Sequence, residues 1–187
     1  KMGVDFHSAD FIAFDNYVKI FKDRQFINSF WVTLKFSLIE TPLQMLIGII
    51  ISAIIAKNNF FNRCVRSIYF LPVITSAVTV GIMWQMLLHS NVGLFTWWLQ
   101  ILGFGKINLL NDPNTALYAV IGVSLWRSFG ISTIILVSAI QNVPIDYYEA
   151  AELDGASKIR QFFSITLPDI MPAVWFLLMT RIIGSLQ

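Results

Sequence analysis

A hydrophilic stretch in the last third of the chain has the residue types of a docking surface. Its fixed positions follow the pattern E-A-A-x3-G-x9-I-x-L-P and are Glu149, Ala150, Ala151, Gly155, Ile165, Leu167 and Pro168. The glutamate offers a carboxylate to a basic partner, and the two small alanines permit close approach of another protein. The glycine can take the left-handed conformation that ends helices. Such a segment could transmit a rigid-body movement.

Three ionisable residues, Glu40, Arg127 and Arg181, lie inside long apolar segments. A charge at the centre of a membrane costs at least ~2.5 kcal/mol on insertion scales, so such residues normally face a bundle interior or a water-filled cavity. Glu40 could pair with an arginine for a structural reason. Alternatively, the arginines line a solute pathway and bind sugar hydroxyls or an acidic sugar, or one of the three sits in the interface. Trp84 either anchors at the headgroup region or stacks on a sugar ring.

The sequence lacks the patterns that catalysis and metal binding require. It contains no G-x4-G-K-[ST], no H-E-x-x-H and no G-x-S-x-G. The single cysteine, Cys64, excludes an internal disulfide and a multi-cysteine metal site. We therefore expect no catalytic residue, no metal and no cofactor in this chain.

The composition is that of a membrane protein. Hydrophobic residues make up 56% of the 187 positions and charged residues only 13%, and the mean hydropathy is +0.67; soluble domains carry about 25% charged residues. A spanning helix needs about 20 mostly apolar residues. Four segments qualify, at about 27–56, 66–88, 115–141 and from 169 onward. These continuous runs predict an all-α, polytopic transmembrane helical bundle rather than strands.

The basic residues of the connections predict an orientation. Connection 57–66 has three basic residues and no acid, whereas the longer connection 89–114 has one. Connection 142–168 contains Lys158 and Arg160. Three basic residues also lie near the start of the first span and leave that span balanced, so the later connections decide. The first and third connections are expected to be cytoplasmic and the middle one external.

Within 142–168 we expect two short helices joined at Gly155. Asn142 would cap the first helix, and the second would run from about residue 157 to 165, with Pro168 as its stop. The same composition also fits an amphipathic connector that rests on the membrane.

The ordered pattern resembles the EAA loop of the membrane-spanning subunits of ATP-binding-cassette importers. Pro144, five residues before Glu149, and the triplet Asp154-Gly155-Ala156 are typical of the carbohydrate-importer branch. Similarity to the maltose-type permease subunit covers nearly the whole chain. It includes N-S-F-W at 28–31, F-L-P at 70–72 and G-S-L-Q at 184–187.

The resemblance implies a type I importer permease fold, with residues 1–187 forming one transmembrane domain. Four spans of a six-helix core would be present, with one helix before Lys1 and one after Gln187 lying outside this fragment. The cytoplasmic loop 142–168 would form the coupling helix that docks on an ATPase. The coupling residues would be Glu149, Ala150, Ala151, Asp154, Gly155, Ile165, Leu167 and Pro168.

The expected function is that of a permease subunit of an ATP-driven carbohydrate importer in the bacterial inner membrane, with ATP hydrolysis in a separate subunit. Expected partners are ATPase subunits, a second and different permease, an extracytoplasmic sugar-binding protein and membrane lipid, without nucleic acid. Glu40, Trp84, Arg127 and Arg181 are the candidate pathway residues. The alternatives are an importer of a polyol or a glycerol phosphate, or a non-transporting membrane receptor or assembly protein.

Overall fold

Two helices are long and apolar enough to cross a membrane by themselves. The computed structural model describes residues 14–105 and 108–186, and all regular structure in these ranges is helical. The two long helices are α2 (Arg24–Ile55) and α6 (Ala116–Gln141). With 32 residues, α2 is about 48 Å long, which exceeds the ~30 Å hydrocarbon core. The all-α membrane fold and the spans expected at 27–56 and 115–141 are confirmed.

The expected span over 66–88 is broken, so the expectation of one continuous helix was wrong, although the two helices together are still apolar enough for one broken span. Its residues belong to α3 (Phe60–Ile74) and α4 (Ala77–Leu87), which are bent by 98° relative to each other. Thr75 and Ser76 between them both have ψ near 140°, in the extended range, and this turns the chain. The Thr75 hydroxyl donates a hydrogen bond of 2.9 Å to a carbonyl oxygen in the last turn of α3. Serine and threonine side chains commonly satisfy the backbone of interrupted membrane helices in this way.

The C-terminal part is also bent, by 63°. It consists of α8 (Lys158–Gln161), the π-helical turn η1 (Phe162–Thr166), α9 (Leu167–Asp169) and α10 (Met171–Ser185). Pro168 does not stop the helix as predicted, because the wider π turn precedes it: the Leu167 N–H donates to the Phe162 carbonyl, five residues back. A π turn relieves the clash that a proline ring makes with the carbonyl four residues back. The break comes at Ile170 instead.

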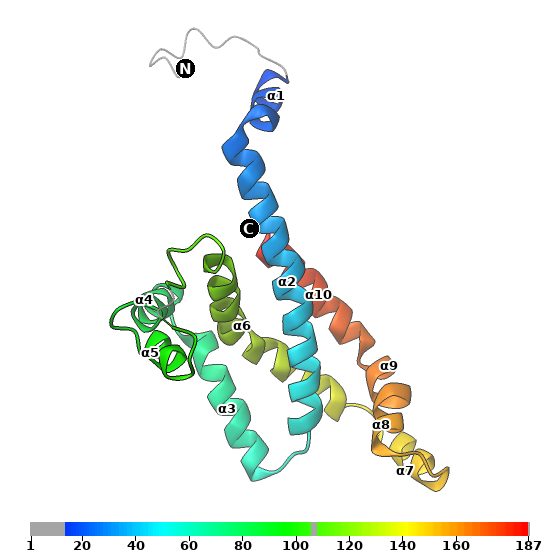
Figure 1. Ribbon diagram of the computed structural model, residues 1–187. Helices are drawn as coiled ribbons and strands as arrows, with labels where there is room; N and C mark the ends of the chain where they lie inside the picture. The colour runs from blue at the N-terminus through cyan, green and yellow to red at the C-terminus, as the bar shows by residue number, and fades with distance from the viewer. Residues whose placement is uncertain (1–13, 106–107, 187) are drawn as a thin grey trace.

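Helix α6 lies at the centre of the bundle and packs against α2, α3 and α10, while α10 also packs on α2 (Figure 1). Gly130 of α6 lies directly on the backbone of α3, where an added Cβ would come within 2.2 Å of the Tyr69 carbonyl oxygen. Helix α1 (Asp15–Lys22) packs on α2 at the end far from the 142–168 loop. The expected outer connection contains a helix that the sequence did not indicate, α5 (Leu94–Ile101).

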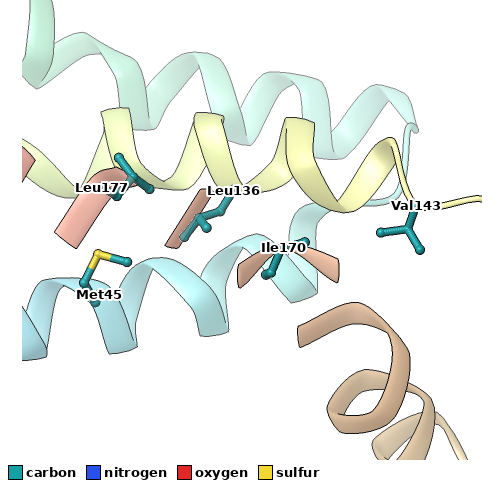
Figure 2. Close-up of a cluster of buried hydrophobic side chains, with 5 residues drawn as sticks. All are labelled: Met45, Leu136, Val143, Ile170 and Leu177. Atoms are coloured by element: carbon teal, nitrogen blue, oxygen red, sulfur yellow. The ribbon is translucent and has the colours of Figure 1, made fainter. Parts of the chain in front are cut away.

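The buried hydrophobic cluster lies at the end of the bundle next to the loop. It contains Met45 of α2, Leu136 of α6, Leu177 of α10, and the two junction residues Val143 and Ile170 (Figure 2). Each of these is at most 7% exposed. The loop that follows α6 is therefore anchored to the same core that holds the spans together.

Candidate functional site: a surface loop and a membrane chamber

The 142–168 loop begins with a short helix whose start differs from the expected one. Helix α7 (Ile145–Leu153) has Pro144 at its N-cap and no side-chain cap, so the prediction that Asn142 caps this helix was wrong. Asn142 instead ends α6, where its N–H donates to carbonyls of the last turn. Pro144 fits the N-cap because its missing N–H removes one of the donors that a helix start leaves unpaired.

Gly155 ends α7 as the sequence predicted. Its φ of +74° lies in the left-handed region, its N–H donates to the Glu152 carbonyl at 3.0 Å, and the Ala156 N–H donates to the Ala151 carbonyl at 2.9 Å. These two bonds are the paired contacts of a Schellman motif, which fixes the direction of the chain after a helix. A hydroxyl then caps α8, because the Ser157 side chain accepts from the Arg160 N–H at 3.3 Å.

Across this turn, Lys158 forms an ion pair and hydrogen bond with Glu152. The hydrogen bond from Lys158 and the positive charge of the same ammonium hold the pKa of Glu152 below its ordinary value. Both side chains are exposed. The pair is therefore a minor, salt-sensitive addition to the backbone bonds of the turn.

The fixed residues of the motif divide into an exposed part and a packed part. Glu149, Ala150 and Asp154 are exposed, and the neighbouring Leu153 is 91% exposed. The side chains that pack against the buried cluster come from the second half and from α7, and they are Ile165, Leu167 and Tyr148. Of the remaining expected residues, Ala151 and Gly155 form the Schellman turn, and Pro168 follows the π turn.

The two halves of the loop are joined by side-chain hydrogen bonds that the sequence did not reveal. The Tyr148 hydroxyl is 2.8 Å from Thr166 Oγ1, across 18 positions of sequence, and Thr166 is 5% exposed. Gln161 Nε2 donates to the Ala156 carbonyl at 3.2 Å. Helix α7 is therefore exposed to solvent but is bonded to η1 and packed on the bundle core.

The 142–168 loop and the α2–α3 connection lie at the same end of the bundle. Gln141 Nε2, at the end of α6, donates to the Ala56 carbonyl, at the end of α2, at 2.7 Å, and Figure 1 shows both connections at that end. This agrees with their expected placement on one side of the membrane. That this side is cytoplasmic stays a prediction from the basic residues.

A cavity of about 640 Å³, which we call the chamber, lies between the middle of α2, the middle of α6 and the C-terminal part of α10. It brings together Glu40, Arg127 and Arg181, three residues that the sequence singled out at membrane depth. The chamber is also lined by hydroxyl groups and by two aromatic rings. These are Ser124, Ser128, Thr180 and Ser185, with Phe36 and Phe176.

The three charged groups of the chamber differ in their hydrogen-bond partners and in their exposure. Glu40 is 3% exposed, and its Oε1 accepts a hydrogen bond of 3.1 Å from Ser124. Arg181 Nη2 donates to the Ser128 carbonyl at 2.9 Å. Within the described residues Glu40 forms no ion pair with an arginine inside 4.0 Å, so the partner expected for it is replaced by a serine. Arg127 is exposed in the cavity.

The hydroxyl partners of these charges were missed by the sequence reasoning, although a signal existed. Ser124, Ser128 and Ser132 recur every four positions on α6, which places them on one face of a helix. Ser132 is fully buried and accepts a bond of 3.2 Å from Gln44 Nε2 of α2. A polar face on an otherwise apolar span indicates where it meets other helices.

The structure places Trp84 away from the chamber. Its indole ring makes edge contacts with Trp126 and Phe95, at centroid distances of 5.4 and 6.3 Å. It lines a separate, mostly apolar cavity of about 380 Å³ together with residues of α5 and α6, such as Tyr118. These contacts favour a packing role for this ring.

Known proteins with similar sequences include permease proteins of transport systems. The chain is 31% identical, over 95% of its length, to the trehalose/maltose transport system permease protein MalF of Thermococcus litoralis. It is also 31% identical, over 94% of its length, to the sn-glycerol-3-phosphate transport system permease protein UgpA of Escherichia coli. The chain spans about 60% of the length of these relatives.

Solved structures agree with this similarity. The fold matches a bacterial ABC transporter involved in the import of the acidic polysaccharide alginate with a TM-score of 0.82 and 28% identity, covering 93% of this chain and 62% of that one. A bacterial alginate ABC transporter in complex with an alginate pentasaccharide-bound periplasmic protein matches with a TM-score of 0.84 and 27% identity, covering 91% and 60%.

Residues 44–187 match the family described as "Binding-protein-dependent transport system inner membrane component". This range includes α6, the whole 142–168 loop and α10, and thus most of the site described above. The chain belongs to the family of binding-protein-dependent transport system inner membrane components.

Proposed function

We propose that this chain is part of a permease subunit of an ATP-driven carbohydrate importer, in which α7 couples the bundle to an ATPase. The observation that carries this proposal is the build of the 142–168 loop. An exposed helix ends in a fixed turn, and its base is packed into the core of the bundle. A movement of the ATPase at α7 would therefore reach the spans without being absorbed by a flexible joint.

The surface of α7 has the chemistry of a docking site. Three of its apolar side chains face outward, with Leu153 91%, Ile145 65% and Tyr147 54% exposed. Apolar residues so exposed on a loop outside the spans are what a partner surface covers. Glu149 adds a carboxylate for a basic residue of the partner, and Ala150 permits close approach.

In this proposal the chamber is the part of the translocation pathway that this subunit supplies. Glu40, Arg127 and Arg181 would contact the solute near the middle of the membrane, where α2, α6 and α10 converge. Aromatic faces and hydroxyl groups in the same cavity suit sugar rings. The complete pathway is proposed to need a second, different permease, an extracytoplasmic binding protein and two ATPase subunits in the bacterial inner membrane.

The named substrates of the similar proteins support a carbohydrate, since they include trehalose or maltose and alginate. The second candidate is a phosphorylated polyol. It is favoured by the similarity to the glycerol-3-phosphate permease, at the same 31% identity.

The test is ATP hydrolysis by the full-length complex in liposomes with its binding protein, over a panel of sugars and polyols. We expect one sugar to stimulate hydrolysis, and the substitution Glu149→Arg to remove both the stimulation and co-purification of the ATPase. Asp15→Arg, an equal charge reversal on α1 at the other end of the chain, serves as the control.

Retention of the ATPase and of stimulated hydrolysis by Glu149→Arg would contradict the coupling role of α7. Stimulation by a glycerol phosphate and by no sugar would replace the carbohydrate assignment by the second candidate. Failure of the wild-type complex to bind any ATPase would favour a non-transporting membrane protein.

A further inference from the structure

The charges of the chamber do not cancel. Two guanidinium groups, of Arg127 and Arg181, face one carboxylate, of Glu40, and no other ionisable side chain among residues 14–105 and 108–186 lines the chamber. The cavity therefore carries one net positive charge close to the middle of α6 and α2. A charge at membrane depth is costly unless it is paired or faces a water-filled cavity, and an anionic group bound in the chamber would neutralise this excess.

Two of the three charged groups already form a hydrogen bond within the protein. Glu40 is almost fully buried and accepts from Ser124, and Arg181 donates to the Ser128 carbonyl. The side chain of Arg127 has no hydrogen-bond acceptor among the described residues, and it is exposed on the cavity wall. The excess charge is therefore located on Arg127, the group that is free to bind something else.

The chemistry of a free guanidinium narrows what it binds. Its five N–H donors form a planar fork that matches the paired oxygens of a carboxylate or a phosphate. A neutral sugar could hydrogen-bond to it but would leave the net charge of the chamber uncompensated. The hydroxyl groups of Ser124, Thr180 and Ser185 each donate their own hydrogen within the protein, and their oxygens can accept from a polyhydroxylated molecule. The rings of Phe36 and Phe176 suit its apolar ring faces.

We propose that the solute carried through the chamber is a polyhydroxylated anion whose carboxylate or phosphate binds Arg127, with Arg181 as a second donor. This inference rests on the proposed function, because it assigns a substrate class to the proposed pathway. Glu40 limits the selectivity: it cancels one of the two positive charges, so that the chamber suits a single anionic group.

The test compares uptake of matched probes by the complete transporter, with its binding protein, in proteoliposomes. The probes are a neutral glucose oligosaccharide, the corresponding glucuronate oligosaccharide and a glucose phosphate. We expect Arg127→Gln to lower uptake of the preferred acidic probe by about tenfold or more at low concentration, as expected for loss of a charged hydrogen bond. Arg127→Lys keeps the charge but not the fork, so a smaller loss is expected.

A second variant makes the test independent of folding defects. Glu40→Gln keeps an acceptor for Ser124 but raises the net charge of the chamber, so the ratio of acidic to neutral uptake should rise. Misfolding cannot produce opposite changes of this ratio in the two variants. Arg63→Gln, at an exposed arginine of α3 outside the chamber, is the matched control and should leave the ratio unchanged.

The outcomes separate the two proposals. Uptake of the neutral probe alone would overturn the anionic class while leaving a carbohydrate importer in place. Equal losses of acidic and neutral uptake in Arg127→Gln would also overturn it, and would indicate that the arginine pairs with an acid of the second permease. A preference for the uronate or for the phosphate identifies the anionic group. No uptake of any probe by an assembled complex would overturn both proposals.

Discussion

The 142–168 loop and the chamber hold their residues in place by different means. In the loop, the hydrogen bonds that fix the shape join residues close in sequence. The turn at Gly155 is closed by backbone bonds within six residues, and the side-chain hydrogen bond between Tyr148 and Thr166 spans 18 positions. At the chamber, Glu40 and Ser124 are 84 positions apart, and the lining residue Ser185 donates a hydrogen bond of 2.7 Å to Ser37 of α2, 148 positions away. The first site is a property of a segment, whereas the second exists only when α2, α6 and α10 have packed.

This difference has a consequence for mutation. Changes in the loop that leave its buried residues in place should remove the proposed coupling while the chamber stays formed, because the bonds that shape the turn lie within the loop. Changes at helix crossings should remove both sites together, because the chamber has no walls without the crossings. Each substitution below tests one side of this contrast.

The largest effect is expected for Gly130→Val at the crossing of α6 and α3. The added Cβ would lie 2.2 Å from the Tyr69 carbonyl oxygen, and backbone atoms cannot move aside as a flexible side chain can. We expect a loss of more than about 3 kcal/mol in stability, seen as a lower melting temperature and aggregation of the complex in size-exclusion chromatography. Gly81→Val is the matched control, because nothing lies within 4 Å of its Cβ position. Equal behaviour of the two variants would contradict the close crossing.

A smaller effect on stability but a strong one on coupling is expected for Gly155→Val. At φ +74° a β-branched residue is strained, by about 1–2 kcal/mol, although the space around the glycine is open. The turn should open and the ATPase dissociate, whereas a ligand of the chamber should still bind. Gly155→Asn should retain coupling, since asparagine tolerates the left-handed conformation. Loss of chamber binding in Gly155→Val would show that the two sites are not separable.

Tyr148→Phe should have a moderate effect. It removes the hydroxyl from the 2.8 Å contact with Thr166, which is worth about 0.5–1.5 kcal/mol, and it keeps the ring that packs on the core. We expect the number of solutes imported per ATP to fall while the ATPase stays bound. The double variant with Thr166→Val measures the coupling between the two residues. Strictly additive effects on transport would contradict a direct role for this bond.

The smallest effect is expected for the Glu152–Lys158 pair. Because the folded state lowers the pKa of Glu152, the pair contributes fully at neutral pH. This contribution is lost as the pH falls below about 4.3, the unperturbed value of a glutamate, and through the lower folded-state value. In Glu152→Gln the melting temperature should therefore decrease slightly less steeply as the pH is lowered through this range. At pH 7, Glu152→Gln should lower the melting temperature less in high salt than in low salt. An equal decrease in both would be inconsistent with an exposed pair, because salt screens it.

Much of the loop could be predicted from sequence because its determinants are local. The left-handed glycine that ends α7, and the two short helices on either side of it, have a short-range physical cause. Two details differed. Asn142 was expected at the helix start, where Pro144 stands, and Pro168 was expected to stop a helix that continues through a π turn. Where α7 begins and where the later helix breaks depend on the burial of Val143 and Ile170 in the core of the packed bundle.

The sequence by itself determined that this chain crosses a membrane, where α2 and α6 run, and that Gly155 ends α7. The tertiary structure decided the rest. It broke the span at Thr75 and Ser76, gave Glu40 a serine in place of an arginine, and separated Trp84 from the chamber. The reason is that apolar length and turn chemistry act within a segment, whereas the partner of a buried polar group depends on how helices rotate and cross. That geometry is set by contacts between residues far apart in the chain, such as the contact of Gly130 in α6 with the backbone of α3.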